Sequence, residues 1–342
     1  MRAAIYQKFG GPILIEDVPE PEPPRDGVVI AVEASGLCRS DLHGWDGLDP
    51  DVELPMVPGH ELAGTIGAVG SDVRNWAVGD RVTVPFCCGC GVCEQCQVGN
   101  TQICDDYFQP GFTGWGSFAQ RVAIPAADVN LVALPDDLDY PEGAILGCRF
   151  ITAYRAVVQR GRVSEGEWLA VYGCGGLGLS AVMIAAAKGA RVVAIDIGDK
   201  TLALARSLGA EATVNATSGE VSSAVLELTA GGADVSIDAV GNPRVAADAL
   251  LSLRKLGRHV QVGLLNEGPT PLPMDTVVAR ELEVLGSHGM AVGDYGEVFD
   301  MIAGLDLSML ISRRLSLDEF PAALESMRGF TGAGISVVTD FD

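Results

Sequence analysis

A glycine-rich turn between an apolar strand and an apolar helix constrains the fold of this chain more than any other sequence feature. The turn comprises Gly173, Cys174, Gly175, Gly176, Leu177 and Gly178. The expected strand before it covers residues 168–172, and the expected helix after it covers residues 177–188. Glycines permit a tight turn there, and the unpaired N–H groups at the start of a helix attract anions. The pattern is typical of a phosphate-binding turn in an α/β domain.

The alternation of strands and helices continues beyond this turn. Apolar runs at residues 191–195, 233–239 and 258–262 are expected to form strands, and residues 200–208 a helix. Strands that are separated by crossover helices pair in parallel. The second half of the chain is therefore predicted to be a doubly wound parallel sheet.

Asp196 ends the strand that follows the glycine turn, 23 residues after Gly173. An acidic residue at this place accepts hydrogen bonds from the ribose hydroxyls of a dinucleotide and repels a 2′-phosphate. The alternative is a solvated aspartate at the end of a strand. The combination of turn, helix and Asp196 favours NAD over NADP as the cofactor.

The first part of the chain has a different pattern. Residues 1 to about 145 are rich in glycine and proline, with alternating runs expected as strands at 28–32, 64–69, 80–84 and 117–124. Residues 144–158 are expected to form a linking helix, and the chain ends with an expected helix at 318–327 and strand at 335–339. With 342 residues, two domains are expected, and the tail is predicted to return to the first of them.

Four cysteines lie close together within the first of these two regions. Cys90, Cys93, Cys96 and Cys104 have the spacing Cys-x2-Cys-x2-Cys-x7-Cys in a glycine-rich loop. Four thiolates fit a closed tetrahedral Zn²⁺ site, which has a structural role. The alternatives are an iron–sulfur cluster or a set of buried free cysteines. The adjacent Cys87 and Cys88 are interpreted as residues outside the site.

A second set of potential ligands is dispersed along the chain. Cys38, His60 and Cys148 offer two thiolates and one imidazole, which leave one tetrahedral position on a zinc ion for water or an alcohol. Their spacing alone leaves other interpretations open. His60 beside a glycine is compatible with a loop or core histidine, and Cys148 with a packing role.

The order of these motifs resembles that of the zinc-containing medium-chain alcohol dehydrogenases over nearly the whole chain. The motifs are Cys38-x2-Asp41-x-His43, Gly59-His60-Glu61, the four-cysteine loop and the glycine-rich turn. The resemblance implies a GroES-like, β-rich catalytic domain over residues 1–147, completed by about 288–342. It also implies a Rossmann cofactor domain over residues 148–287, so the fold class is α/β.

The resemblance implies roles for residues around a catalytic zinc. Cys38, His60 and Cys148 are its expected ligands, and Glu61 is a transient or alternate ligand. Asp41 is expected to orient His60. Together with the four-cysteine loop, this gives two zinc ions per subunit.

Ser40 and His43 are the expected proton relay by the same resemblance. The hydroxyl of Ser40 would hydrogen-bond the alcohol, and His43 would pass the proton to solvent through the cofactor ribose. From the sequence alone, Ser40 is equally compatible with capping a helix that begins near Asp41.

The resemblance also implies contacts to the cofactor and the substrate. The expected cofactor residues are Arg39, Gly173, Gly175, Gly176, Leu177, Gly178, Asp196, Lys200, Val262 and Leu264. The expected substrate pocket contains Trp45, Phe86, Trp115, Phe118 and His288, with Leu264 beside them. Many relatives carry an arginine near the C-terminus where this chain has Ser336, and Arg39 is the candidate to compensate for it.

The expected function is the reversible NAD-dependent oxidation of a primary or secondary alcohol to an aldehyde or ketone. A polyol or threonine-type zinc dehydrogenase is the alternative, and a non-catalytic zinc- and NAD-binding protein is a more distant one. The sequence does not determine the physiological alcohol. Relatives of this length are commonly homo-oligomers, so a tetramer is favoured over a dimer.

The charge of the chain limits its partners. Its 45 acidic and 23 basic residues give a net charge of −22, which repels nucleic acids and anionic membranes. Residues 1–6 are expected to form a strand, so no basic and apolar leader is expected, and the sequence has no run of 18 apolar residues. A cytoplasmic protein that acts on a small alcohol or aldehyde, without nucleic-acid or membrane partners, is expected.

Overall fold

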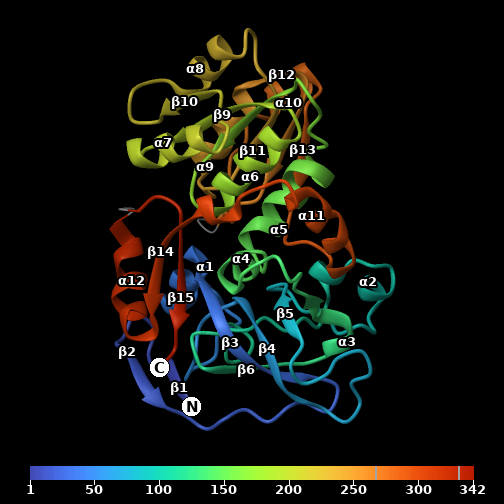
Figure 1. The fold of residues 1–342 in the computed structure, drawn as a ribbon. Helices are drawn as coiled ribbons and strands as arrows, with labels where there is room; N and C mark the ends of the chain where they lie inside the picture. The colour runs from blue at the N-terminus through green and yellow to red at the C-terminus, as the bar shows by residue number, and fades with distance from the viewer. Residues whose placement is uncertain (266–267, 330–331) are drawn as a thin grey trace. The chain divides into compact units, whose positions relative to one another are not determined.

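The computed structural model of the protein describes residues 1–265, 268–329 and 332–342. The chain forms two compact units (Figure 1). The first unit contains Met1–Arg149, Gly289–Thr331 and Ile335–Asp342, and the second contains Phe150–His288 and Gly332–Gly334. The boundary expected between residues 147 and 148 lies two residues before this division, so Cys148 belongs to the first unit. No helix in the described ranges is long and apolar enough to cross a membrane.

The first unit is built around a seven-stranded sheet in the order β14-β15-β3-β4-β5-β7, with β6 paired to β3. Its strands are β3 (Val28–Leu37), β4 (Glu61–Val69), β5 (Arg81–Val84), β6 (Arg121–Ile124), β7 (Val132–Ala133), β14 (Ile311–Ser316) and β15 (Ile335–Asp340). The pairs are antiparallel except β14 with β15. A separate antiparallel pair is formed by β1 (Arg2–Tyr6) and β2 (Ile13–Asp17).

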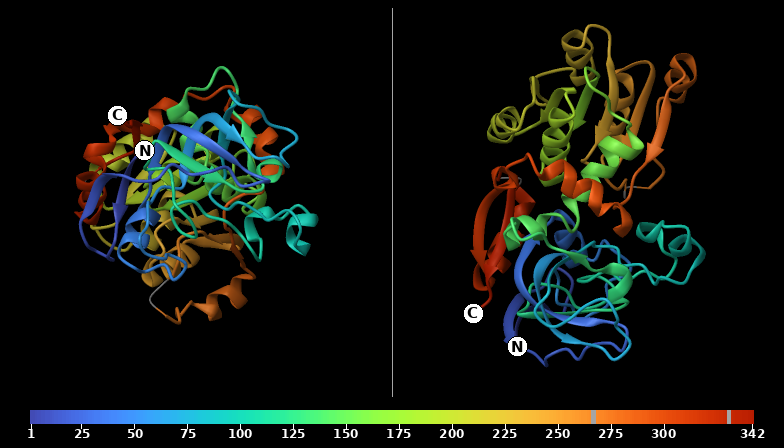
Figure 2. Two further views of the ribbon diagram at one scale, coloured as in Figure 1. Left: turned by 90° about the horizontal axis from the view of Figure 1, so that it is seen from below. Right: turned by 45° about the vertical axis from the view of Figure 1, so that its right-hand side comes forward.

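Short helices connect the strands of the first unit. They are α1 (Arg39–Trp45), α2 (Glu94–Gln97), α3 (Ala127–Asn130), α4 (Tyr140–Ile145), α11 (Tyr295–Ile302) and α12 (Phe320–Ser326), with 3-10 turns at Thr101–Ile103, Val292–Asp294, Leu307–Leu310, Leu317–Glu319 and Met327–Gly329. The C-terminal strand returns to this unit, as expected, because Ser336 on β15 pairs with Leu37 on β3. Both ends of the chain therefore lie in the first unit, as Figures 1 and 2 show.

The expected strand at 117–124 is shorter than predicted. Only Arg121–Ile124 forms a strand, because the backbone before it bonds to the loop that precedes β4. Ser117 N–H donates to Gly59 O at 2.9 Å, and Phe118 N–H donates to Pro58 O at 2.9 Å. These bonds hold the loop that carries His60.

The expected single helix at 144–158 is wrong. The chain forms α4 up to Ile145, then a break, then α5 (Arg149–Tyr154), which continues as a π-helix over Arg155–Arg160. The carbonyls in the break bond outside the helix: Leu146 O accepts from the Tyr295 hydroxyl at 3.0 Å, and Gly147 O accepts from Phe86 N–H at 2.8 Å. Gly147 also packs against β5, where a Cβ would lie 2.8 Å from Val84 O. The break places Cys148 between two helices.

The second unit is a parallel sheet of six strands in the order β10-β9-β8-β11-β12-β13 (Figure 1). Its strands are β8 (Trp168–Tyr172), β9 (Arg191–Asp196), β10 (Ala212–Asn215), β11 (Ala233–Asp238), β12 (Leu253–Gln261) and β13 (Glu283–Gly286). Its helices are α6 (Gly176–Ala187), α7 (Asp199–Ser207), α8 (Val221–Leu228), α9 (Pro243–Leu251) and α10 (Met274–Arg280). The predicted doubly wound parallel sheet is confirmed. The strand order reverses between β8 and β11, the position where ligands bind in such sheets.

Candidate metal and cofactor sites

Three separate segments of the first unit bring Cys38, His60 and Cys148 together. Cys38 directly follows β3, which ends at Leu37, and directly precedes α1, and His60 directly precedes β4. Because β3 and β4 pair antiparallel, with Gly36 opposite Glu61, the end of one strand meets the start of the other. Cys148 joins them from the break between α4 and α5.

The side chains of this cluster converge closely. One ligand atom from each of Cys38, His60, Glu61 and Cys148 lies within 4.8 Å of the others. Cys38, His60 and Glu61 are buried, and Cys148 is partly exposed. Three soft or nitrogen ligands with one carboxylate nearby are a donor set that suits zinc.

Asp41 holds two of these residues in place. Its Oδ1 lies 3.0 Å from His60 Nδ1, and its Oδ2 accepts from the Cys38 N–H at 2.9 Å. Because a carboxylate only accepts, Nδ1 of His60 carries a proton, and in the neutral imidazole that a metal binds Nε2 presents its lone pair. That Nε2 is buried and has no hydrogen-bond partner. A metal ion would satisfy this atom, so the residues fit zinc.

The two thiols of this cluster have opposite pKa shifts. A hydrogen bond from Cys148 lowers the pKa of Cys38 well below its usual value, with further help from His60 and Arg149. The same bond and burial raise the pKa of Cys148. Burial alone would lower the pKa of His60, but the charge and hydrogen bond of Asp41 raise it. Cys38 is therefore the thiol that most readily becomes a thiolate.

Ser40 and His43 lie next to the cluster on α1. The helix begins at Arg39 and Cys38 is its N-cap residue, so the alternative that Ser40 caps this helix is wrong. Ser40 Oγ lies 3.8 Å from Cys38 Sγ. His43 follows one helical turn later and is half-buried; burial, and then the charge of Arg39, lower its pKa. The imidazole of His43 therefore stays neutral down to a lower pH than usual, and in that form it can accept a proton.

Arg149 is a charged residue of the cluster that the sequence analysis did not identify as functional. Its Nε donates to Glu61 Oε1 at 2.7 Å, and its Nη2 forms an ion pair with Glu61 Oε2. Both side chains are almost completely buried. Glu61 lies in the first unit beside the three predicted ligands, and its carboxylate is held by the ion pair with Arg149.

The four-cysteine loop forms a second cluster in the first unit. One ligand atom from each of Cys90, Cys93, Cys96 and Cys104 also lies within 4.8 Å of the others. Backbone N–H groups point at the sulfurs: Cys93 N–H approaches Cys90 Sγ at 3.3 Å, and Cys90 N–H approaches Cys104 Sγ at 3.3 Å. The N–H of Cys96 lowers the pKa of Cys93 to about 6. These contacts favour the thiolate of Cys93, the form that binds metal, whereas burial raises the pKa of Cys96 to about 12 and that of Cys104 above its usual value.

Cys87 and Cys88 do not join either cluster. Burial raises the pKa of both thiols, so they remain neutral. Within the described residues, the two clusters above are the only groups of three or more histidine, cysteine or acidic side chains with metal-binding spacing.

The glycine turn of the second unit has the geometry of a phosphate-binding loop. A Cβ on Gly178 would lie 1.8 Å from Gly173 O, so the helix can pack this closely only with glycine there. Gly173 has a φ of +85°. Gly175 caps α6, and a Cβ on it would meet nothing within 4 Å. The open space beside Gly175 and the start of α6 fit a dinucleotide phosphate.

Asp196 ends β9 beside this turn. Its Oδ2 accepts from the Cys174 N–H at 2.8 Å, and its Oδ1 accepts from the Gly198 N–H at 2.8 Å. Gly176 and Leu177 open α6, Lys200 is exposed at the start of α7, and Val262 directly follows β12. Leu264 and His288 are exposed after β12 and β13. These residues share the carboxyl edge of the parallel sheet.

Arg39 lies in the first unit and donates to Met327 O at 3.2 Å. Ser336, at the position where many relatives are expected to carry an arginine, is in the same unit, on β15, opposite Leu37 of β3. The structure therefore places both residues near the C-terminal segment of this unit.

The expected substrate pocket is only partly assembled in the first unit. Phe86 lies edge-on to His60, with ring centroids 6.3 Å apart. Phe112, which the sequence analysis missed, lies closer, at 5.4 Å. Its signal was weak, because an aromatic residue between two glycines suggests only a loop.

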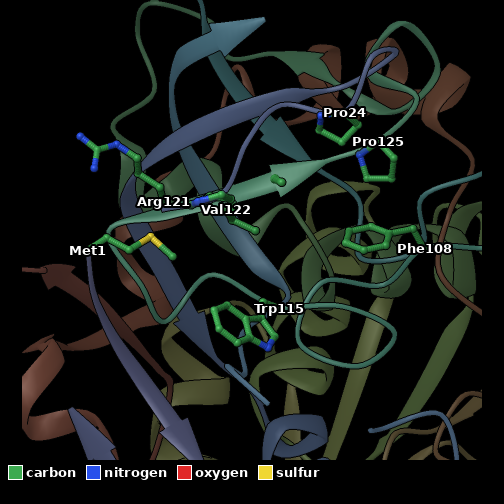
Figure 3. Close-up of a pocket in the computed structure, with 9 residues that line it drawn as sticks. Met1, Pro24, Phe108, Trp115, Arg121, Val122 and Pro125 are labelled. Carbon is green, nitrogen blue, oxygen red and sulfur yellow. The ribbon is translucent and has the colours of Figure 1, made fainter. Parts of the chain in front are cut away.

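Three other expected pocket residues have different surroundings. Phe118 is fully buried and stacks on Phe320 at 3.9 Å, so it belongs to the core and offers no surface to a substrate. Trp45 is 6% exposed, and its indole donates to Gly11 O at 2.8 Å. Trp115 lines a different, apolar hollow with Met1, Pro24 and Phe108 (Figure 3).

Comparisons with known proteins agree with this architecture. Residues 24–136 match the alcohol dehydrogenase GroES-like domain, and residues 176–304 match the zinc-binding dehydrogenase family. An alcohol dehydrogenase of Geobacillus stearothermophilus is 35% identical over 289 residues, covering 84% of each chain. An NAD-dependent alcohol dehydrogenase of Sulfurisphaera tokodaii is 30% identical and covers 99% of each chain.

The solved structure of the alcohol dehydrogenase TADH from Thermus sp. ATN1 superposes with a TM-score of 0.91 at 29% identity, covering 99% of this chain and 100% of that one. The expected fold class, a GroES-like domain with a Rossmann-type parallel sheet, is confirmed by these matches and by the strand order. The ordered motifs, the fold and the sequence matches together show that the chain belongs to the zinc-dependent medium-chain alcohol dehydrogenase family.

Proposed function

We propose that this protein catalyses the reversible NAD-dependent oxidation of a primary or secondary alcohol to an aldehyde or ketone. The convergence of Cys38, His60 and Cys148 from three separate segments carries the proposal. The orientation of His60 by Asp41 supports it, because ligating histidines in zinc sites usually donate their other N–H to a carboxylate or carbonyl.

The residues in and next to the cluster of Cys38, His60 and Cys148 have different roles in this mechanism. Cys38, His60 and Cys148 hold the catalytic zinc. Zinc supplies Lewis acidity, which lowers the pKa of water from about 15.7 to about 7 and has the same effect on an alcohol hydroxyl. Ser40 Oγ would accept the hydroxyl proton as it gives up its own proton, which would pass through the cofactor ribose to His43 and so towards solvent. The lowered pKa of His43 keeps its imidazole available for this step.

The second unit supplies the hydride acceptor by binding NAD. The N–H groups at the start of α6 and the open space beside Gly175 hold the pyrophosphate, with Gly176 and Leu177 on the helix. Asp196 accepts the ribose hydroxyls, and Lys200 lies on the following helix. Val262 and Leu264 would contact the cofactor from the end of β12, and Arg39 would compensate for the absent C-terminal arginine.

The metal content is expected to be two zinc ions per subunit. The first ion is catalytic, and the second is bound by Cys90, Cys93, Cys96 and Cys104, with a structural role. Metal analysis of the purified protein tests the count. A value of about one ion per chain would contradict one of the two sites.

A homo-oligomer, with a tetramer favoured over a dimer, is part of the proposal. The edge strand β13 lies at the end of the parallel sheet, where its outer backbone groups can pair with another copy. Val284 on this strand is 42% exposed, and Val278 on the neighbouring α10 is 75% exposed. Light scattering on the purified protein measures the subunit number. The cytoplasmic location stays a prediction.

A panel assay tests the proposed activity. NADH absorbance is followed with primary, secondary, aromatic and polyol alcohols, and with NADP⁺ in place of NAD⁺. Turnover of simple alcohols supports the proposal, and exclusive turnover of polyols or threonine supports the alternative. Absence of turnover with all of them, in protein that holds zinc, would support a non-catalytic binding protein.

Substitutions at two glycines of the turn distinguish effects on NAD⁺ binding from effects on folding. Gly175→Ala adds a methyl group to open space, so the variant should fold normally but bind NAD⁺ at least about tenfold more weakly, which corresponds to about 1.4 kcal/mol. Gly178→Ala, the contrasting variant, should lose thermal stability because its Cβ meets Gly173 O. Unchanged NAD⁺ affinity in Gly175→Ala would contradict the assignment of the turn.

A further inference from the structure

Glu61 is held unusually firmly for a residue beside a predicted metal site. It is fully buried, and its Oε1 accepts from both the Nε of Arg149 at 2.7 Å and the Arg149 backbone N–H at 3.1 Å. The Arg149 Nη2 pairs with the other carboxylate oxygen. The guanidinium therefore binds both oxygens at once, and this bidentate arrangement is the strongest and most directional one available to a carboxylate.

The surrounding backbone leaves room for this ion pair and for little else. Gly36 on β3 lies directly opposite Glu61 on β4, so side chains at the two positions would share one face of the sheet. A Cβ on Gly36 would lie 2.2 Å from Glu61 Oε2 and 2.9 Å from Arg149 Nη2. The ion pair occupies the space that a side chain at position 36 would fill.

The position of Glu61 creates a competition for the metal. Its carboxylate lies within 4.8 Å of the ligand atoms of Cys38, His60 and Cys148, and carboxylate oxygen is an ordinary zinc ligand. An unpaired carboxylate buried at this place would complete a tetrahedral set of four protein ligands. Such a closed set has a structural role, because no position is left for a substrate.

The charges of the cluster favour the paired arrangement. Two thiolates balance a divalent cation and Arg149 balances Glu61, while the buried carboxylate of Asp41 leaves one negative charge that is hydrogen-bonded to His60 and to the Cys38 N–H. A buried charge without a partner is costly, and removal of one partner of a buried pair leaves the other to find new compensation. The cation that Cys38, His60 and Cys148 would hold is then available to Glu61, whose carboxylate lies within 4.8 Å of their ligand atoms.

We propose that Arg149 is a positioning residue that clamps Glu61 and so keeps the fourth coordination position of the metal open to the substrate. This inference rests on the proposed function. Glu61 then becomes a ligand only when it leaves Arg149. The role belongs to this chain's Gly147-Cys148-Arg149 sequence, which places the arginine next to a ligand at the start of α5.

Cobalt substitution of the full-length enzyme tests the clamp directly. The visible absorption bands of Co²⁺ report its ligands, and added imidazole serves as a probe of the open position. The wild-type bands should shift on addition of imidazole. In Arg149→Met the bands should already differ without imidazole and respond weakly to it, because Glu61 fills the position.

Kinetics should show the same effect. If Glu61 occupies the position in about nine of ten Arg149→Met molecules, the apparent KM for the alcohol rises about tenfold. The kcat should fall less, since the competent fraction still turns over at saturating alcohol. Arg149→Lys keeps the charge without the bidentate geometry, so its spectrum and KM should lie between those of wild type and Arg149→Met.

Removal of the carboxylate provides the matched control. Glu61→Gln in the presence of Arg149 should leave the cobalt bands at their wild-type positions, because Glu61 is not a ligand there. The double variant Glu61→Gln/Arg149→Met should recover the wild-type response to imidazole. It also tests folding, because it removes both charges of the buried pair together.

Several outcomes would overturn the clamp. Wild-type bands in Arg149→Met, or bands that move in Glu61→Gln, would show that Arg149 does not control access of Glu61 to the metal. If Arg149→Met does not fold, Arg149→Lys and the double variant decide the question by the same criteria. Failure of the proposed function is distinguishable, because then Cys38→Ser would take up as much cobalt as the wild type.

Discussion

The two cysteine clusters of the first unit reach similar metal-binding geometry by opposite routes. Cys90 to Cys104 span 15 residues of one loop, whereas Cys38 to Cys148 span 111 residues and three segments. The loop sulfurs are approached mainly by backbone N–H groups, and the dispersed cluster is held by the side chains of Asp41 and Arg149. Three of the loop cysteines are partly exposed, while Cys38 and His60 are buried.

This difference indicates what each cluster depends on. The loop needs only local turns to bring its thiols together, so its metal can stabilise a segment that has few strands. The dispersed cluster needs the pairing of β3 with β4 and the break between α4 and α5 before a metal can bind. Folding therefore prepares the dispersed site, whereas metal binding helps to fold the four-cysteine loop.

Among the variants that distinguish the two clusters, Cys38→Ser is expected to have the largest effect. Loss of a ligand removes the Lewis acid, and several kcal/mol of lost transition-state stabilisation lowers kcat/KM by about 10³-fold or more. Zinc content should fall by about one ion per chain, with the melting temperature little changed. Metal analysis and initial rates on the same sample check this result. Cys87→Ala, outside both clusters, should keep both ions.

Cys104→Ser should have the opposite pattern. Loss of a metal from the loop affects stability, and a loss of about 3 kcal/mol would lower Tm by roughly 6–12 °C. The kcat measured well below this Tm should stay unchanged. Calorimetry and assays at low temperature test the separation, and loss of activity in fully folded protein would contradict it.

Asp41→Asn should weaken only the dispersed cluster. The amide oxygen can accept from the Cys38 N–H or from His60, but the NH₂ group then faces the other donor, so one of these two ligands loses its support. Loss of such a partner typically weakens metal affinity or activity by about 10–100-fold. Competition with a chromophoric chelator measures the affinity of each site. Equal weakening of the loop site would show that Asp41 acts through the fold as a whole.

The smallest expected effect comes from the space beside Glu61. Gly36→Ala forces a methyl group into the Glu61–Arg149 pair, and overpacking of this kind costs about 1–3 kcal/mol. The free energy of unfolding by denaturant measures the cost. Gly67→Ala, on exposed β4 backbone with its nearest atom at 3.7 Å, is the matched control and should change stability by less than about 0.5 kcal/mol. Equal effects in both variants would argue against a tightly filled site.

Features that depend on neighbouring residues were predictable from the sequence. The glycine turn, Asp196 and the alternating strands and helices predicted the parallel sheet, with helix boundaries within one residue for α6 and α7. Short strands such as β10 and β13 carried too few residues for a periodic signal. The helix expected at 144–158 failed because the bonds that interrupt it come from Phe86 and Tyr295, which are distant in the chain.

The sequence by itself determined which residues could bind metal and cofactor, because ligand type and local spacing are written in the chain. Only the tertiary structure decided how these residues are supported. It showed that Asp41 bonds to both Cys38 and His60, that Gly36 makes room for Glu61, and that Arg149 is buried against it. In the sequence, Arg149 next to Cys148 is compatible with an ordinary surface charge. Only strand pairing and the helix break bury it against the carboxylate of Glu61. The physical reason is that burial and ion pairing depend on contacts between segments, which no local pattern encodes.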